Sequence, residues 1–221
     1  MSQSQGRGIP DLAVPRLSHY YRALLESRET DVISSEELSR LTGYSAAQIR
    51  RDLASFGQFG TPGRGYSVLD LRTALLSILG IDKDWHVALV GAGNLGQALL
   101  GYKGFRDQRF KVLYAFDNDP QKIGREFQGV KVYPLSELSQ RIAQNNIRMA
   151  ILTVPVAAAQ EVVNQLVSSG VSAILNFVPV RLKVPEQITV QNIDMAIELE
   201  RLSYRTTRSP GSTKQDTTKQ Q

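Results

Sequence analysis

The stretch HVALVGAGNLG, residues 86–96, decides the fold of this chain. Its first five residues predict a buried parallel strand, and a helix is expected over about residues 97–102. Between them, Gly91 allows a tight turn, Gly93 lets the backbone approach a pyrophosphate, and Gly96 lets the helix pack on the strand. The N–H groups that begin the helix carry partial positive charge, which favours phosphate. We therefore predict a phosphate-binding loop made of Gly91, Ala92, Gly93, Asn94, Leu95 and Gly96.

A second strand is expected over residues 111–116, and it ends at Asp117. Asp117 lies 21 positions after Gly96, where an acidic residue of a dinucleotide-binding βαβ unit binds the ribose 2′-hydroxyl of NAD. A carboxylate there would repel the 2′-phosphate of NADP. Residues 87–117 are therefore predicted to bind NADH or NAD⁺, and the alternative is a tight strand–helix turn without a ligand. Asp119, which precedes a proline, is expected to cap the next helix.

Further apolar β-runs alternate with helical stretches as far as residue 193. The expected strands are residues 130–133, 149–154, 173–177 and 189–193, with a helix over 156–169. This alternation predicts an α/β fold, a Rossmann-like doubly wound sheet with helices on both faces. Ligands of such sheets bind outside the carboxyl ends of the strands. The residues at two of these ends are candidate walls of a nicotinamide site, although each group also fits ordinary loop chemistry: Thr153, Val154, Pro155, Asn176 and Phe177.

Composition and charge exclude several classes of protein. The 221 residues include no cysteine, and no apolar run approaches the ~18 residues that span a bilayer. The N-terminus lacks the apolar core of a signal peptide. We expect a cytoplasmic protein with no membrane segment and no metal site. The net charge of +5 arises entirely from residues 85–221, because residues 1–84 carry ten basic and ten acidic residues. The overall charge is therefore weak evidence for nucleic-acid binding.

The first third of the chain has the pattern of short capped helices. Pro15 can begin a helix. Its apolar side is expected to carry Leu17, Tyr21, Leu24 and Leu25. Ser34 and Glu37 fit a capping box that opens a second short helix, which Gly43 ends. The inward residues of this second helix are expected to be Leu38 and Leu41.

A second predicted capping box, Ser45 to Gln48, follows only two residues after Gly43. The helix that it opens, residues 45–56, places Ile49, Leu53 and Phe56 on one face. Gln48, Arg51 and Ser55 lie roughly opposite, with Arg50 to one side. Two capped helices joined by a tight glycine-containing turn predict a helix-turn-helix whose polar, cationic face suits a DNA major groove.

The stretch GQFGTPGRGY, residues 57–66, follows this helix and suits a β-hairpin wing with Arg64 at its tip. Arg64 there could enter a minor groove or meet a phosphate. A fourth helix is expected over about residues 70–79. The alternative is that the arginines are solvated surface charges. The residues assigned to DNA are Ser45, Gln48, Arg50, Arg51, Ser55, Phe56, Gly57, Arg64, Gly65 and Tyr66.

The chain lacks the usual equipment of a dehydrogenase, which needs an acid or base beside the nicotinamide. Its two histidines are His19, in the first helix, and His86, at the start of a strand. Neither is expected at the carboxyl end of a strand, and no catalytic domain is expected after the sheet. A dinucleotide site fused to a helix-turn-helix indicates a sensor and not an enzyme. The alternatives are an NAD-dependent enzyme with a helical dimerisation domain, and a sheet that binds coenzyme A.

Five segments, residues 45–66, 90–105, 116–124, 152–155 and 174–180, resemble the family of redox-sensing transcriptional repressors called Rex. The resemblance covers about residues 15–205. It implies a homodimer that binds a palindromic, double-stranded operator through paired winged helices and leaves the DNA when NADH binds. It thereby senses the NADH/NAD⁺ ratio. Within the third segment, Lys122 and Ile123 are also assigned to the cofactor site.

The resemblance also implies that the last helix, residues 195–205, is exchanged between protomers, although its apolar stripe could equally close its own domain. It implies that Arg22, Tyr102 and Asp194 couple the nucleotide site to the DNA-binding domain, with Arg16 as the alternative to Arg22. The expected organisation is a flexible arm (1–14), a winged-helix domain (15–82), a Rossmann domain (85–194), the exchanged helix and a disordered tail (206–221).

Overall fold

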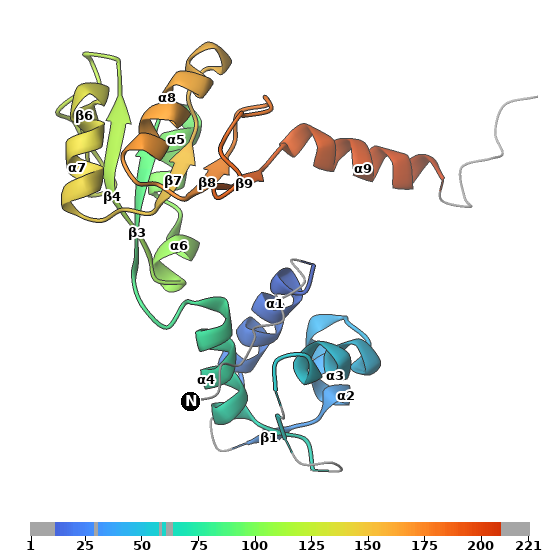
Figure 1. Ribbon diagram of the computed structural model, residues 1–221. Helices are drawn as coiled ribbons and strands as arrows, with labels where there is room; N and C mark the ends of the chain where they lie inside the picture. Colours follow the sequence, from blue (N-terminus) through green and yellow to red (C-terminus); the bar gives the residue numbers. More distant parts are fainter. Residues whose placement is uncertain (1–11, 29–30, 58, 61–63, 209–221) are drawn as a thin grey trace, which may run out of the picture. The chain divides into compact units, whose positions relative to one another are not determined.

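The computed structural model describes residues 12–28, 31–57, 59–60 and 64–208 (Figure 1). The chain divides into two compact units, Met1–Asp84 and Trp85–Gln221. The division falls where capped helices give way to alternating strands and helices in the sequence. No helix in the described ranges is both long and apolar enough to cross a bilayer.

The first unit is built mainly of helices around one apolar core. Its helices are α1 (Val14–Leu25), α2 (Ser35–Thr42), α3 (Ala46–Ala54) and α4 (Val68–Leu79), and its strands are β1 (Val32–Ile33) and β2 (Tyr66–Ser67). The core side chains come from all four helices and include Leu17, Tyr20, Leu24, Leu38, Ile49, Leu53, Leu71 and Leu75. Helices α2 and α3 form the predicted helix-turn-helix.

The caps explain where these helices begin and end. The predicted capping box at Ser34 is confirmed, since both of its hydrogen bonds with Glu37 are present. Gly43 ends α2 in the left-handed conformation, with φ of 76°. The second box is only half formed: Ser45 accepts the Gln48 N–H, but the Gln48 side chain turns to Asp52 instead of back to Ser45. Ser67 caps α4, which therefore begins two residues earlier than expected.

Two apolar positions predicted to face inward, Leu25 and Leu41, are exposed instead. The buried stripe of α1 runs through Leu17, Tyr20 and Leu24, and Tyr21 is half-buried beside it and packs against the core. On α2 the stripe runs through Ser35 and Leu38. Leu41 lies to one side of that stripe and is 55% exposed.

The second strand of the expected wing pairs antiparallel with β1, with Val32 opposite Ser67 and Ile33 opposite Tyr66. Gly65, with φ of 88°, has to be glycine here because a Cβ would lie 2.6 Å from the Ile33 carbonyl oxygen. Residues 58 and 61–63 lie outside the described part of the chain, so the hairpin tip itself stays a prediction.

The second unit contains a seven-stranded sheet in the order β5-β6-β4-β3-β7-β8-β9. Its strands are β3 (Trp85–Val90), β4 (Phe110–Asp117), β5 (Glu126–Phe127), β6 (Val130–Pro134), β7 (Met149–Leu152), β8 (Ala173–Asn176) and β9 (Thr189–Asn192). Every neighbouring pair is parallel except β5 with β6. The chain leaves the central strand β3 first in one direction and later in the other, which creates a crevice at its carboxyl end.

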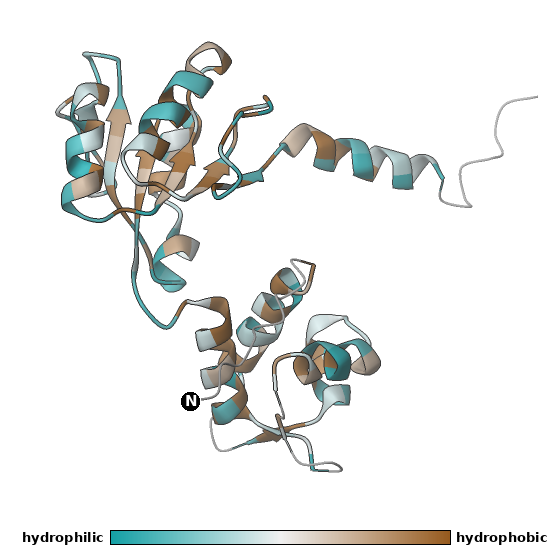
Figure 2. Cartoon of the chain, viewed as in Figure 1, coloured by the Kyte–Doolittle hydropathy of each residue, from teal (hydrophilic) through white to brown (hydrophobic). Residues whose placement is uncertain are grey.

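Helices cover both faces of this sheet, as the doubly wound prediction requires (Figure 1). They are α5 (Asn94–Leu100), α6 (Lys103–Asp107), the 3₁₀ turn η1 (Leu135–Glu137), α7 (Leu138–Gln144) and α8 (Val156–Ser168). Alternate residues of β3 join different cores: Ala88 and Val90 pack with α7 and α8, whereas Leu89 packs with α5. The central strands are apolar along most of their length (Figure 2).

Several boundaries differ from the sequence expectation. Asp119 is followed by turns and not by a helix, and the short β5–β6 hairpin was not expected. The phosphate-loop helix begins at Asn94, earlier than expected. The prediction of a flexible arm over residues 1–14 is wrong at its C-terminal end, because Ala13 is buried and α1 begins at Val14. Residues 1–11 lie outside the description.

The last helix, α9, spans Met195–Thr207 and so extends two residues into the segment expected to be a disordered tail. Residues 209–221 of that tail lie outside the description. None of the α9 side chains is buried by the described part of the chain. The large exposed apolar residues of this helix are Met195, Ile197, Leu199, Leu202 and Tyr204.

Candidate functional sites

A cavity of about 630 Å³ opens at the carboxyl ends of β3, β4 and β7. Of the predicted cofactor residues, those that line it are Gly91, Gly93, Asp117, Lys122, Thr153, Val154 and Pro155. The sequence alone does not assign to the cofactor site the lining residues Asn118, Asp119, Leu135, Ala158 and Val162, which lie beside Asp117 or on η1 and α8. The sequence indicates these residues only indirectly, because the segments that follow the strands of a doubly wound sheet form the walls of its ligand-binding crevice.

The three glycines of the loop have three different environments. At Gly91, with φ of 101°, a Cβ would lie 2.6 Å from the Thr153 carbonyl oxygen. At Gly96 a Cβ would overlap the carbonyl oxygen of Gly91. At Gly93 φ is an ordinary −75°, and no described atom beyond its two chain neighbours lies within 4 Å of the place that a Cβ would take. Gly91 and Gly96 are therefore required by the fold, while Gly93 keeps open the space that a bound phosphate would need.

Hydrogen bonds tie this loop to its neighbours. The Gly91 N–H donates to the Phe116 carbonyl at 2.8 Å, and the Thr153 hydroxyl donates to the Gly91 carbonyl at 2.8 Å. The Gln97 amide donates to the Ala92 carbonyl. The loop is thus fixed between β4 and the end of β7 before any ligand binds.

Asp117 lies at the end of β4 with both carboxylate oxygens engaged. It accepts the Ala92 N–H at 2.8 Å, the Asp119 N–H at 2.9 Å and the Lys122 ammonium at 3.2 Å. The Lys122 ammonium also lies 3.4 Å from Asp119. Partial burial alone would lower the pKa of Lys122, but its hydrogen bonds to the two carboxylates outweigh this effect and raise it. Lys122 therefore stays cationic at the rim of the cavity.

Asn176 does not line the cavity, although the sequence predicts that it forms a wall of the nicotinamide site. Its side chain is 1% exposed. Its amide donates to the Asn192 side chain at 2.8 Å and to the Val178 carbonyl, while its oxygen accepts the Val178 N–H. A buried amide must be satisfied, and here it serves the loop that follows β8. Phe177 packs instead into the core on the α5 face.

The other predicted cofactor residues that do not line the cavity are Ala92, Asn94, Leu95, Gly96 and Ile123. Ala92 and Gly96 act through the backbone of the loop. Within the described residues no cluster of potential metal ligands occurs.

The predicted DNA face lies on α3 and the turn before it. Ser45, Arg50, Arg51 and Ser55 are exposed there, and Gln48 and Phe56 are half-buried. The remaining predicted DNA residues lie beyond α3: Gly57 and Arg64 are exposed, and Gly65 and Tyr66 are half-buried. The Arg50 guanidinium donates to the Ser35 hydroxyl at 2.6 Å and to the Glu36 carboxylate at 2.8 Å, which ties it to the start of α2.

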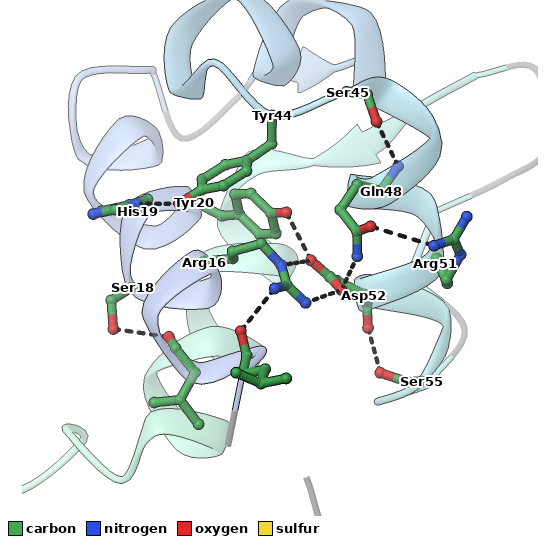
Figure 3. Close-up of polar contacts among 12 residues, drawn as sticks. Arg16, Ser18, His19, Tyr20, Tyr44, Ser45, Gln48, Arg51, Asp52 and Ser55 are labelled. Carbon is green, nitrogen blue, oxygen red and sulfur yellow. Dashed lines mark hydrogen bonds and ion pairs between the residues drawn. The ribbon is translucent and has the colours of Figure 1, made fainter. Parts of the chain in front are cut away.

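Beneath this face lies a buried carboxylate to which the sequence analysis assigns no role. Asp52 is 5% exposed and binds α1 to α3 (Figure 3). It accepts hydrogen bonds from Arg16 at 2.6 and 2.8 Å, from the Tyr20 hydroxyl at 2.8 Å and from Gln48 at 2.7 Å. Burial would raise the pKa of Asp52, but these hydrogen bonds outweigh it and lower the pKa below its usual value.

The three residues expected to couple the units have different surroundings. The Tyr102 ring is exposed, covers Gly104 and meets Phe105 edge-on. Asp194 caps α9 by accepting the Ala196 N–H at 2.9 Å. Arg22 is exposed on α1. The alternative residue, Arg16, is held by Asp52, which favours Arg22 for the coupling role.

Comparisons with known proteins match both units and the whole chain. Residues 82–180 match the model of the CoA binding domain, and residues 8–54 match that of a putative DNA-binding protein N-terminus. Over 198 residues the chain is 47% identical to the redox-sensing transcriptional repressor Rex of Desulfitobacterium hafniense, covering 89% of this chain and 94% of that protein. The chain belongs to the Rex family. The Rex protein of Syntrophomonas wolfei is also 47% identical, with the same coverage.

Solved Rex-family structures extend the match to three dimensions. The Rex-family repressor RSP in complex with NAD⁺ and operator DNA is 39% identical, with a TM-score of 0.84, over 91% of this chain and 94% of that one. RSP in complex with NADH gives 36% identity and a TM-score of 0.80, over 91% and 96%. Rex relatives are named as repressors and not as enzymes, which confirms the prediction of a sensor over that of a dehydrogenase.

Proposed function

We propose that this chain is a cytoplasmic repressor that binds a palindromic operator as a homodimer and leaves it when NADH binds. The observation that carries the proposal is the presence of two sites in one chain. The first unit presents exposed Arg51 on the second helix of a helix-turn-helix, and the second unit holds a glycine loop beside Asp117. The relative RSP has been solved with operator DNA and NAD⁺ and separately with NADH.

The dinucleotide is proposed to lie across the cavity at the end of β3. Its pyrophosphate would occupy the open space at Gly93, where the first N–H groups of α5 are available. Asp117, held at the rim by Ala92, would accept the ribose hydroxyls. Leu135 and Val162 give the neighbouring wall an apolar surface that suits a flat base. Val154 and Pro155 are proposed to face the nicotinamide, where an apolar wall favours neutral NADH over the NAD⁺ cation.

The homodimer is proposed to form through α9. Met195, Leu199 and Leu202 share one face of this helix at the spacing i, i+4, i+7, each is more than half exposed, and the described part of the chain leaves them uncovered. An apolar stripe of this kind on a helix commonly packs against another surface. A second copy of the chain fits best, because two recognition helices can then meet two half-sites about one DNA turn apart, ~34–36 Å. Arg22, Tyr102 and Asp194 are proposed to transmit nucleotide binding to the DNA-binding units.

The central test is to titrate operator complexes with NADH and with NAD⁺ at fixed salt. We expect NADH to weaken operator binding by about 5–150-fold, the usual range of allosteric coupling, and NAD⁺ to weaken it much less. Analytical ultracentrifugation should show two chains on one palindromic operator. An operator affinity that NADH does not change would refute the sensor, and turnover of hydride with alcohols or hydroxy acids would favour an enzyme.

Asp117→Arg is expected to reduce NADH affinity at least tenfold, because it removes the acceptor for the ribose and breaks the hydrogen bond to Ala92. Operator affinity in the absence of nucleotide should stay unchanged, and release by NADH should be lost. The matched control is Asp107→Arg, which makes the same change of charge on an exposed helix of the same unit. Loss of operator binding by Asp117→Arg alone would indicate misfolding and contradict the assignment.

A further inference from the structure

A continuous chain of hydrogen bonds runs from α1 through the interior of the first unit to the exposed face of α3. It begins at Arg16 and Tyr20, passes through Asp52 and Gln48, and ends at Arg51 (Figure 3). Its first members are buried or half-buried, and its last is exposed. The interior of this unit is thereby linked to one side chain that is available to a ligand.

The Asp52 carboxylate cannot rotate freely, because Arg16 binds it through two N–H groups and the Tyr20 hydroxyl donates to the same carboxylate. Its oxygen Oδ1 therefore has a fixed direction. The Gln48 side-chain nitrogen donates to this oxygen at 2.7 Å. The opposite orientation of the amide would bring the Gln48 oxygen against a carboxylate, so Asp52 determines which end of the amide faces the solvent.

The outward end of this amide is its oxygen, and it accepts a hydrogen bond from Arg51 Nη1 at 3.3 Å. A guanidinium has five N–H groups, so four remain for a ligand after this contact. Two are enough for a bidentate bond to the major-groove edge of guanine or to a phosphate. Gln48 has fewer hydrogen-bonding groups left for a ligand than Arg51, because its nitrogen and its oxygen are both engaged within α3.

We propose that Gln48 is a positioning residue for operator recognition: Asp52 fixes its amide, and the amide holds Arg51 in the conformation that reads DNA. This inference rests on the proposed function, and it replaces the expectation that Gln48 itself contacts DNA. Arranging a long side chain before binding lowers the entropy that has to be lost on binding. Gln48 thus acts on operator affinity through Arg51.

Arg50 provides the natural comparison. It is an exposed arginine on the same helix, next to Arg51 in sequence, but its hydrogen bonds go to Ser35 and Glu36 at the start of α2. These bonds hold Arg50 independently of Gln48, so a change at Gln48 should leave its conformation unaltered.

The test is a double-mutant cycle on operator affinity, measured with the full-length chain at fixed salt. Gln48→Met keeps the length of the side chain and removes both hydrogen bonds. We expect it to weaken operator binding about fivefold, the order of effect of ordering one long side chain. Arg51→Met should weaken binding at least about tenfold. In the Arg51→Met background, Gln48→Met should change affinity less than about twofold, whereas with Arg50→Met the two effects should multiply.

The outcomes distinguish a failure of the proposed DNA face from a failure of the positioning role of Gln48. If Arg51→Met leaves operator affinity unchanged, the DNA face assigned under the proposed function is wrong, and the positioning role falls with it. If Arg51→Met weakens binding but Gln48→Met has the same effect with and without Arg51, Gln48 touches DNA itself and the inference is overturned. Gln48→Met without any effect also overturns it. Thermal unfolding of each variant checks that the fold is intact, because a merely structural role would lower stability in both backgrounds alike.

Discussion

Gly96→Ala is expected to abolish measurable NADH binding and to destabilise the second unit by about 1–3 kcal/mol, the usual cost of inserting a methyl group where no space exists. The added Cβ would overlap the carbonyl oxygen of Gly91. That oxygen cannot move away freely, because the Thr153 hydroxyl donates to it at 2.8 Å and the Gly91 N–H is bound to Phe116. Either the loop or the start of α5 has to shift, and both are needed to hold a pyrophosphate.

Gly93→Ala is the matched control for this prediction. Its backbone has an ordinary φ of −75°, and no described atom beyond its two chain neighbours would lie within 4 Å of the new methyl group. The variant should unfold at the same temperature as the parent and bind NADH more weakly, since the methyl group occupies space proposed for phosphate. Calorimetry gives the stabilities, and the fluorescence of Trp85 offers a signal for titration with NADH. A Gly96→Ala protein that binds NADH as the parent does would contradict the role given to this glycine.

Features that depend on local backbone geometry could be predicted from the sequence. Gly91 needs a positive φ and Gly96 a close approach, and residues with no side chain are the only ones that satisfy both, so the pattern marks the turn directly. The cap at Ser34 could be predicted for a similar reason, because its partner Glu37 lies three residues away. Asp117 could be predicted because a strand ends there and the crevice of the sheet lies at strand ends.

Features that depend on contacts between residues far apart in the sequence could not be predicted in this way. Arg16 and Asp52 are 36 positions apart, and neither residue type predicts burial. Asn176 ends a strand, as a ligand-binding residue would, yet its amide serves the loop beside it. The surface that packs against α9 cannot be found among the described residues either, because every residue of this helix is exposed or half-exposed. Sequence patterns locate such groups on an element but do not say which partner satisfies them.

Asp52→Ala is expected to destabilise the first unit by about 3 kcal/mol while leaving the second unit unchanged. Removing one partner of a buried ion pair costs about 3–5 kcal/mol, because the other charge is left uncompensated. The expected value lies at the lower end because Arg16 is partly exposed. Tyr20 also loses the acceptor for its buried hydroxyl. Glu36→Ala, which breaks the exposed pair with Arg50, should destabilise the first unit much less, because solvent screens an exposed ion pair. Calorimetry that resolves the unfolding of the two units measures both; equal effects of the two variants would contradict the structural role of Asp52.

The ion pair of Arg16 with Asp52 also predicts how the stability of the first unit depends on pH. The pKa of Asp52 is lower in the folded chain than its ordinary value of about 3.9, so the folded state binds the proton less readily than the unfolded state does. Its contribution is therefore fully present above about pH 4 to 5 and is lost as the pH falls through the folded-state pKa. The difference in stability between the parent and Asp52→Ala should stay constant from pH 6 down to about pH 5 and shrink as the pH is lowered further toward 3. Other acids, such as Glu37, contribute equally to both proteins and cancel in this difference. A difference that stays constant down to pH 3 would mean that Asp52 stabilises the fold by packing and not by its charge.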